Sequence, residues 1–120
     1  MKSRFHVLLI ALVALAPLSL AKRLPPPVVR PVVFNGVEYS AHGDGTHGWI
    51  TATEVATRKE LWTAKVFRIH THWWKGEEDN QWIYISDLKL EQNTLFIKDE
   101  KPRCYRLSLN TRRVRRERCH

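Results

Sequence analysis

The sequence lacks the patterns that identify several common protein classes. It has no run of about 20 apolar residues, which a membrane-spanning helix requires; its longest apolar run, Val7–Ala16, is half that length. It contains no Cys-x-x-Cys or His-Glu-x-x-His metal-site spacing, no Gly-x-Ser-x-Gly element and no glycine-rich phosphate loop. Beyond the N-terminal segment, no window shows sustained helical periodicity. These absences argue against a membrane-spanning protein, the motif-bearing enzyme classes and a helical domain.

The first 21 residues follow the order typical of a secretory signal peptide. Lys2 and Arg4 precede the apolar run, Pro17 ends it, and Ser19 and Ala21 are small residues three and one positions before a cleavage point. We therefore predict a helical signal peptide over residues 1–21 and a mature protein that is exported, either periplasmic or secreted. The alternative, an uncleaved anchor, is disfavoured by the short apolar run.

The rest of the chain divides into a short linker and one domain. Residues 22–31 contain Pro25, Pro26, Pro27 and Pro31, which favour an extended polyproline II arm. Residues 32–120 form the predicted domain, which is small enough that a covalent cross-link would help to stabilise it.

Turn residues divide this domain into short strands. The predicted strands are 32–39, with a turn at Asn35-Gly36, then 49–54, 60–73, 82–90, 94–98, 103–109 and 114–119. The glycine-rich stretch 41–48 is predicted as a loop. In 82–90 strict alternation would place Trp82, Ser86 and Leu88 on one face and Ile85 on the other. The sequence therefore predicts an all-β fold, with about seven or eight antiparallel strands in a curved or two-layer sheet.

The stretch 52–62, Ala-Thr-Glu-Val-Ala-Thr-Arg-Lys-Glu-Leu-Trp, is the most specific motif of the chain. It resembles the Ala-x-Asp-x-x-Thr-Gly-Lys-x-x-Trp repeat of quinoprotein (PQQ-like) β-propellers. The resemblance implies a β-hairpin whose Trp62 packs against a neighbouring blade, with Arg58 at the position of the repeat's glycine. A degenerate second copy follows at 107–114, where Thr111-Arg112-Arg113 corresponds to Thr57-Arg58-Lys59.

Chain length limits what the resemblance implies. A propeller needs at least about four blades, and blades of this kind take about 40–50 residues. The mature chain supplies about two, so we expect no closed propeller and no quinone bound on an axis. A role as accessory partner of a quinoprotein-like enzyme, or a homo-oligomer, stays open.

The two cysteines are placed by strand register. If Leu109 faces Val114 across the last hairpin, Cys104 faces Cys119 and Arg106 faces Glu117. Directly opposed residues have β-carbons about 4.5–5.5 Å apart, close to what a disulfide needs. In an oxidising compartment we therefore predict a Cys104–Cys119 disulfide.

Histidines offer the main candidates for metal binding or catalysis. His70 and His72 are two residues apart, so on a strand they would share a face, and His42 or His47 could add a third ligand for zinc or copper. With Asp44 the same residues form the only plausible catalytic cluster, but no nucleophile accompanies them. We expect a protein that is not an enzyme and has no cofactor, with metal binding as the alternative.

Aromatic residues favour binding. The domain contains five tryptophans, of which Trp73 and Trp74 are adjacent. Neighbours on a strand alternate sides, so one of them is predicted to be exposed, as an anchor for a glycan, a peptide or a membrane interface; packing against the 41–48 loop or a second sheet is the alternative.

The C-terminal arginines do not favour nucleic acid. Arg116 and Arg118 would share one strand face and Arg113 and Arg115 the other, which fits a charged edge strand that resists aggregation. The function predicted overall is an exported, non-catalytic binding module whose partner is an unknown protein or envelope ligand.

Overall fold

The computed structural model describes residues 24–119. The predicted signal peptide and the start of the linker therefore lie outside the described residues. The fold is all-β, as predicted, with eight antiparallel strands in two four-stranded sheets. The strands are β1 (Val32–Phe34), β2 (Val37–Gly43), β3 (His47–Glu54), β4 (Glu60–Arg68), β5 (Ile85–Glu91), β6 (Thr94–Asp99), β7 (Cys104–Ser108) and β8 (Val114–Glu117).

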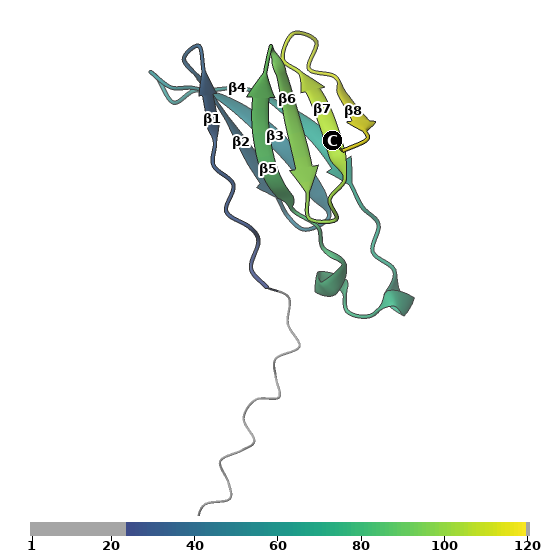
Figure 1. Ribbon diagram of the computed structural model, residues 1–120. Helices are drawn as coiled ribbons and strands as arrows, with labels where there is room; N and C mark the ends of the chain where they lie inside the picture. Colours follow the sequence, from purple (N-terminus) through teal and green to yellow (C-terminus); the bar gives the residue numbers. More distant parts are fainter. Residues whose placement is uncertain (1–23, 120) are drawn as a thin grey trace, which may run out of the picture.

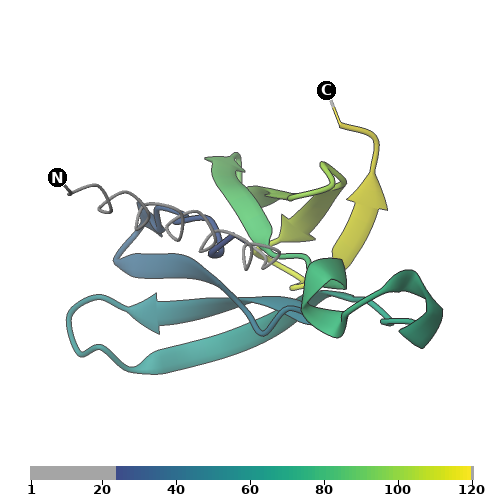
Figure 2. The same cartoon turned by 90° about the horizontal axis from the view of Figure 1, so that it is seen from below.

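Each sheet is an up-and-down meander of four consecutive strands. The two sheets lie as separate layers (Figures 1 and 2), and corresponding strands meet between them, because β5 contacts β1 and β8 contacts β4. The chain thus folds as two successive units of the same architecture, without closing into a barrel.

The core lies between the layers. Side chains on alternate strand positions point inward, and Ile50, Leu95 and Leu107 are completely buried. Val29 of the N-terminal arm also packs against this core, so the end of the predicted linker belongs to the folded body. The opposite face of the second sheet is polar, with Lys89 and Arg106 exposed.

Corresponding turns of the two units have the same backbone geometry. In the β3–β4 turn, Arg58 has φ 61° and its N–H donates to the Glu54 carbonyl at 2.8 Å. In the β7–β8 turn, Arg112 has φ 62° and its N–H donates to the Ser108 carbonyl at 2.7 Å. The hairpin predicted from the 52–62 motif is thus present, and the arginine adopts the left-handed conformation that glycine favours.

The disulfide is present, but the predicted register is wrong by two residues. Leu107, not Leu109, pairs with Val114, because the turn already closes between Ser108 and Arg113. Cys104 therefore faces Glu117. Cys119 lies just beyond the end of β8 and forms the disulfide with Cys104 from there, with 5.2 Å between the Cα atoms of the two cysteines.

The predicted charge pair survives this shift as a diagonal contact. The Nε atom of Arg106 lies 3.2 Å from Oε1 of Glu117, although Arg106 pairs directly with Arg115. Long side chains reach diagonal neighbours across a sheet, so the pairing did not require the predicted register.

Three other predictions need correction. The predicted loop 41–48 is mostly strand, since β2 continues to Gly43 and β3 begins at His47. The predicted strand 60–73 ends at Arg68. In β5, a register irregularity between Ile85 and Asp87 breaks the alternation, so that Ile85 and Leu88 are both buried. A bulge of this kind lets residues of odd and even number face the same core.

Candidate functional site

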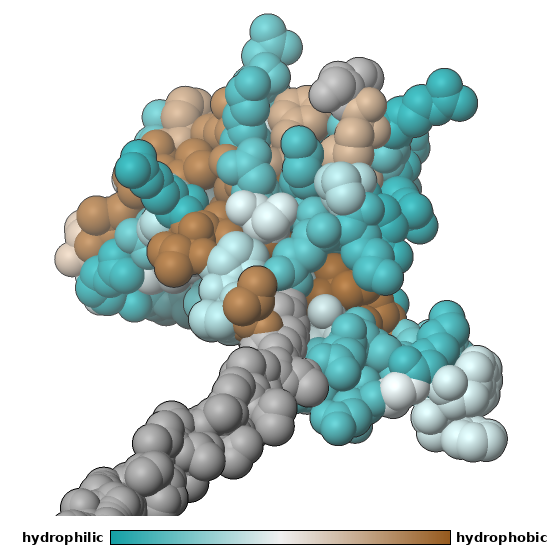
Figure 3. All heavy atoms as spheres, turned by 60° about the horizontal axis from the view of Figure 1, so that its bottom comes forward, coloured by the Kyte–Doolittle hydropathy of each residue, from teal (hydrophilic) through white to brown (hydrophobic). Residues whose placement is uncertain are grey.

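The segment between the two sheets forms a projection that we call the tryptophan lobe, residues 69–84. It contains two short 3₁₀ helices, η2 (Trp73–Lys75) and η3 (Glu78–Gln81). The lobe extends from one end of the sandwich, away from both sheets (Figures 1 and 3).

The glycine-containing β2–β3 loop holds the base of the lobe. The Ile69 N–H donates to the Thr46 carbonyl at 2.7 Å, and the Ile83 N–H donates to the Gly45 carbonyl at 2.9 Å. The Trp82 ring packs against Gly45, where an added Cβ would lie only 2.5 Å from ring atoms. Both ends of the lobe are therefore fixed to the same loop.

A single side chain organises the interior of the lobe. The Gln81 carboxamide accepts a hydrogen bond from the His72 N–H at 2.7 Å and donates to the His72 carbonyl at 2.8 Å. It also donates to the Gly76 carbonyl at 3.3 Å. Gln81 thus satisfies backbone groups on both sides of η2 and holds the turn that carries the tryptophans.

Both adjacent tryptophans are exposed, where the sequence predicted one. Trp73 is 87% exposed and Trp74 is 63% exposed. Strand alternation does not apply, because the two residues lie in a 3₁₀ turn. Their rings meet edge to face at 5.8 Å, and the His72 ring stacks on Trp74 at 4.5 Å. The rings support one another and leave much of their surface open to solvent.

The lobe is acidic within a basic protein. It carries Glu77, Glu78 and Asp79 against the single cation Lys75, whereas the chain as a whole has a formal charge of +8. The ion pairs formed among residues 24–119 lie elsewhere and include none of these four side chains. Lys75, Glu77 and Glu78 are exposed and Asp79 is half-buried.

The histidines are not gathered on one strand face. His70 and His72 lie beyond the end of β4, so the face predicted for them does not exist. His42 contacts Ser40 at 3.0 Å, and His47 lies 3.3 Å from Asp44. Within residues 24–119, no three His, Cys, Asp or Glu side chains are placed to hold a metal ion.

Asp44 caps a turn in this region. Its carboxylate accepts hydrogen bonds from the N–H groups of Thr46, at 2.9 Å, and His47, at 2.8 Å. These donors lower the pKa of Asp44 to about 2, because hydrogen bonds to a carboxylate favour its charged form. The arrangement explains the His-Gly-Asp-Gly stretch as a turn that supports the lobe.

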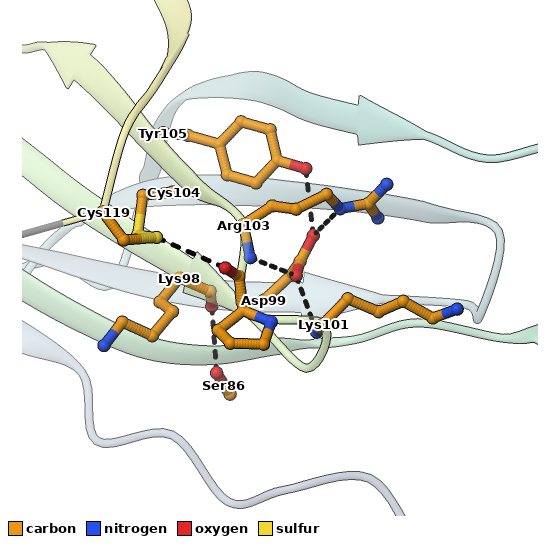
Figure 4. Close-up of a disulfide and its surroundings, with 9 residues drawn as sticks. Ser86, Lys98, Asp99, Lys101, Arg103, Cys104, Tyr105 and Cys119 are labelled. Atoms are coloured by element: carbon orange, nitrogen blue, oxygen red, sulfur yellow. Dashed lines mark hydrogen bonds and ion pairs between the residues drawn. A yellow bond between two sulfur atoms is a disulfide. The ribbon is translucent and has the colours of Figure 1, made fainter.

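A buried polar cluster at the corresponding turn of the second unit was not predicted. Asp99, whose side chain is inaccessible, accepts hydrogen bonds from the Lys101 and Arg103 N–H groups, from Arg103 Nε at 2.8 Å and from the Tyr105 hydroxyl at 3.0 Å (Figure 4). Burial alone would raise the pKa of Asp99, but these donors outweigh it and the pKa lies below its usual value. Burial, with the bond to Asp99, raises the pKa of Tyr105 to about 12.

This cluster stabilises the β6–β7 turn. Asp44 and Asp99 open corresponding turns, and each carboxylate accepts from the N–H two residues later. A carboxylate with this many donors is a poor proton acceptor at neutral pH. The only sequence signal was an aspartate directly after the predicted strand 94–98, where a turn begins.

A surface hollow on the second sheet lies apart from the lobe. It has a volume of about 480 Å³ on the outer face of the second sheet and is lined by Phe96, Arg106 and Glu117, among others. The Arg106 guanidinium lies over the Phe96 ring at 5.3 Å and pairs with Glu117, so the polar groups of the hollow satisfy one another in part.

No protein-family model matches this chain, and a search of curated proteins found no match either. Among the residues that the structure describes, no helix has the length and apolar character needed to cross a membrane.

Proposed function

We propose that this protein is an exported, non-catalytic binding module of the cell envelope or extracellular space, anchored to its partner by Trp73 and Trp74. The observation that carries the proposal is the exposure of two adjacent indoles on a lobe that hydrogen bonds hold in place. Tryptophan is enriched among the residues that dominate binding energy at interfaces. Fixing the rings before binding reduces the entropy lost when a partner binds.

Export is supported by two independent features. The N-terminal sequence has the order of a signal peptide, and the Cys104–Cys119 disulfide is consistent with an oxidising compartment. Protein isolated from the producing cells should begin at Lys22 and should have no thiol that can be alkylated without reductant.

The binding proposal is tested with the mature chain and an envelope fraction from the same cells. We expect the wild-type protein to co-sediment with that fraction and the double variant Trp73→Ala/Trp74→Ala to stay in the supernatant. The matched control is Val33→Ala/Leu61→Ala, which removes two exposed apolar side chains from the first sheet. Equal retention of all three proteins would refute the proposed anchor.

A second candidate function follows from the propeller-type repeat. We propose that the two sheets descend from two such units. This is supported by the matching turns at Arg58 and Arg112 and by Trp62, which lies against Tyr39 at 5.9 Å and under Arg112 of the other unit at 5.2 Å. If the protein has an accessory role beside a quinoprotein-like enzyme, it should co-purify with such an enzyme from the same host. A preparation without that enzyme would refute the accessory role and leave only the proposed common ancestry of the two sheets.

A further inference from the structure

Cations fit the surface of the tryptophan lobe better than anions or neutral ligands do. The face of an indole ring attracts an ammonium or guanidinium group. The adjacent carboxylates of Glu77, Glu78 and Asp79 add a negative electrostatic potential, which also attracts cations. The same carboxylates repel anionic lipid headgroups and phosphates. The lobe therefore differs in charge preference from the arginine-rich β8 edge.

Elsewhere in this chain arginines already use aromatic faces in this way. The Arg112 guanidinium lies 5.2 Å from the centre of the Trp62 ring, and that of Arg106 lies 5.3 Å from the centre of Phe96. Trp73 and Trp74 have no such cation over them among the described residues, although they are the most exposed aromatic rings.

The shape of the lobe favours a macromolecule over a small molecule. Small-molecule sites are concave, whereas the tryptophans lie in η2, a short helix that projects beyond the end of the sheets (Figure 1). The hollow of about 480 Å³ on the second sheet contains no residue of the lobe. A projecting pair of rings makes contact best with an extended partner that can lie across it.

We propose that the tryptophan lobe binds a basic polypeptide segment of a partner protein. Arginine or lysine side chains of that segment stack on Trp73 and Trp74, while Glu77, Glu78 and Asp79 balance their charge. The inference rests on the proposed function, because it assigns a partner chemistry to the same two anchors.

The test uses labelled eight-residue peptides and fluorescence anisotropy with the mature chain. The probe is (Arg-Gly)₄; (Ser-Gly)₄ and (Glu-Gly)₄ are the peptide controls. We expect only the arginine peptide to bind, with an affinity that falls as salt is added. Trp73→Ala/Trp74→Ala should weaken binding about tenfold, the loss expected for two exposed cation–π contacts.

A charge-matched pair of variants separates the lobe from the general surface. Glu77→Gln/Glu78→Gln should weaken binding about threefold and reduce its salt dependence. Asp87→Asn/Glu91→Gln removes the same charge from β5 and should leave binding unchanged. Since all these side chains are exposed, circular dichroism should show the wild-type fold in each variant.

Two results would overturn the inference. One is arginine-peptide binding that is the same in the lobe variants and in the wild type. The other is tryptophan-dependent binding of a neutral chito-oligosaccharide or of phosphatidylglycerol vesicles without binding of the arginine peptide. If envelope retention still depends on Trp73 and Trp74 while the peptide fails to bind, only the partner chemistry is refuted and the proposed function stands.

Discussion

Replacing Asp99 by asparagine should be among the most destabilising isosteric changes in this domain. The carboxylate is inaccessible to solvent and accepts from Arg103 Nε and from the Tyr105 hydroxyl through the same oxygen, Oδ2. Oδ1 accepts from the N–H groups of Lys101 and Arg103. An asparagine can keep one of these two sets of bonds, but its NH₂ group must then face the donors of the other.

The expected magnitude follows from the loss of a buried charge partner. Removing one member of a buried ion pair destabilises by roughly 3–5 kcal/mol. The lower end applies here, because the Arg103 side chain is 27% exposed and can regain some hydration. With a urea m-value of about 1–2 kcal/mol per molar, the unfolding midpoint should fall by about 2 M.

The pH dependence of this loss of stability provides a second test of the role of Asp99. Hydrogen bonding holds the pKa of Asp99 below the usual 3.8, so its contribution is present above that pH and disappears as the pH falls through the folded-state pKa. The stability difference between wild type and Asp99→Asn should therefore shrink in acid.

The matched control is Asp44→Asn, at the corresponding turn of the first unit. Asp44 also accepts two backbone N–H bonds, but its side chain is 54% exposed. Asp44→Asn should therefore lower the urea midpoint much less than Asp99→Asn does. If the two variants unfold at the same urea concentration, the buried cluster does not stabilise the domain as argued.

Three further changes test other parts of the fold. Replacing Cys104 and Cys119 by serine opens a link between residues 15 apart, so urea unfolding should show a loss of about 3 kcal/mol, while the circular dichroism spectrum stays that of the wild-type fold. Gly45→Ala should destabilise more than Gly36→Ala in thermal unfolding: both have positive φ, but only at Gly45 would the new Cβ collide with a ring. Between pH 10 and 12 the domain should lose roughly 3 kcal/mol, because unfolding releases the Tyr105 proton, whose folded-state pKa is about 12; Tyr105→Phe should remove this part of the loss.

Local sequence signals predicted the strands and turns well. Asn35-Gly36, with φ 51° and 75°, makes the expected tight turn, and alternating apolar residues gave the all-β fold. These signals depend on neighbours in the chain, and they need no tertiary information. The division into two sheets was left open, because a curved sheet and two layers bury the same alternating residues.

Predictions that depended on register or on continued alternation failed. The bulge in β5 and the early close of the β7–β8 turn each shift the pairing, and a hydrophobic pattern does not mark such an irregularity. The lobe was misassigned because His70 to Trp73 have strand-like composition, whereas Gln81, nine residues after His72, supplies the bonds that bend the chain. The buried state of Asp99 was equally invisible, since it depends on the sheet that covers it.

The two arginines in left-handed turns allow a last test with an internal control. Arg58→Gly and Arg112→Gly should relieve the same backbone strain, because their φ angles are 61° and 62° and their turns make the same hydrogen bonds. The side-chain losses differ: Arg58 gives up an exposed ion pair with Glu38 at 3.4 Å, whereas Arg112 gives up its contact with the Trp62 ring at 5.2 Å.

An exposed ion pair contributes a few tenths of a kcal/mol and a cation–π contact about 0.5–1 kcal/mol. Arg58→Gly should therefore leave the domain more stable than Arg112→Gly by roughly 0.5 kcal/mol in urea unfolding. Repeating both changes in a Trp62→Leu background should remove the advantage of Arg58→Gly and reverse it by a few tenths of a kcal/mol, because the leucine offers no ring face while the Arg58–Glu38 ion pair is still lost. If Arg58→Gly stays the more stable variant without the indole, Arg112 does not link the two sheets through Trp62.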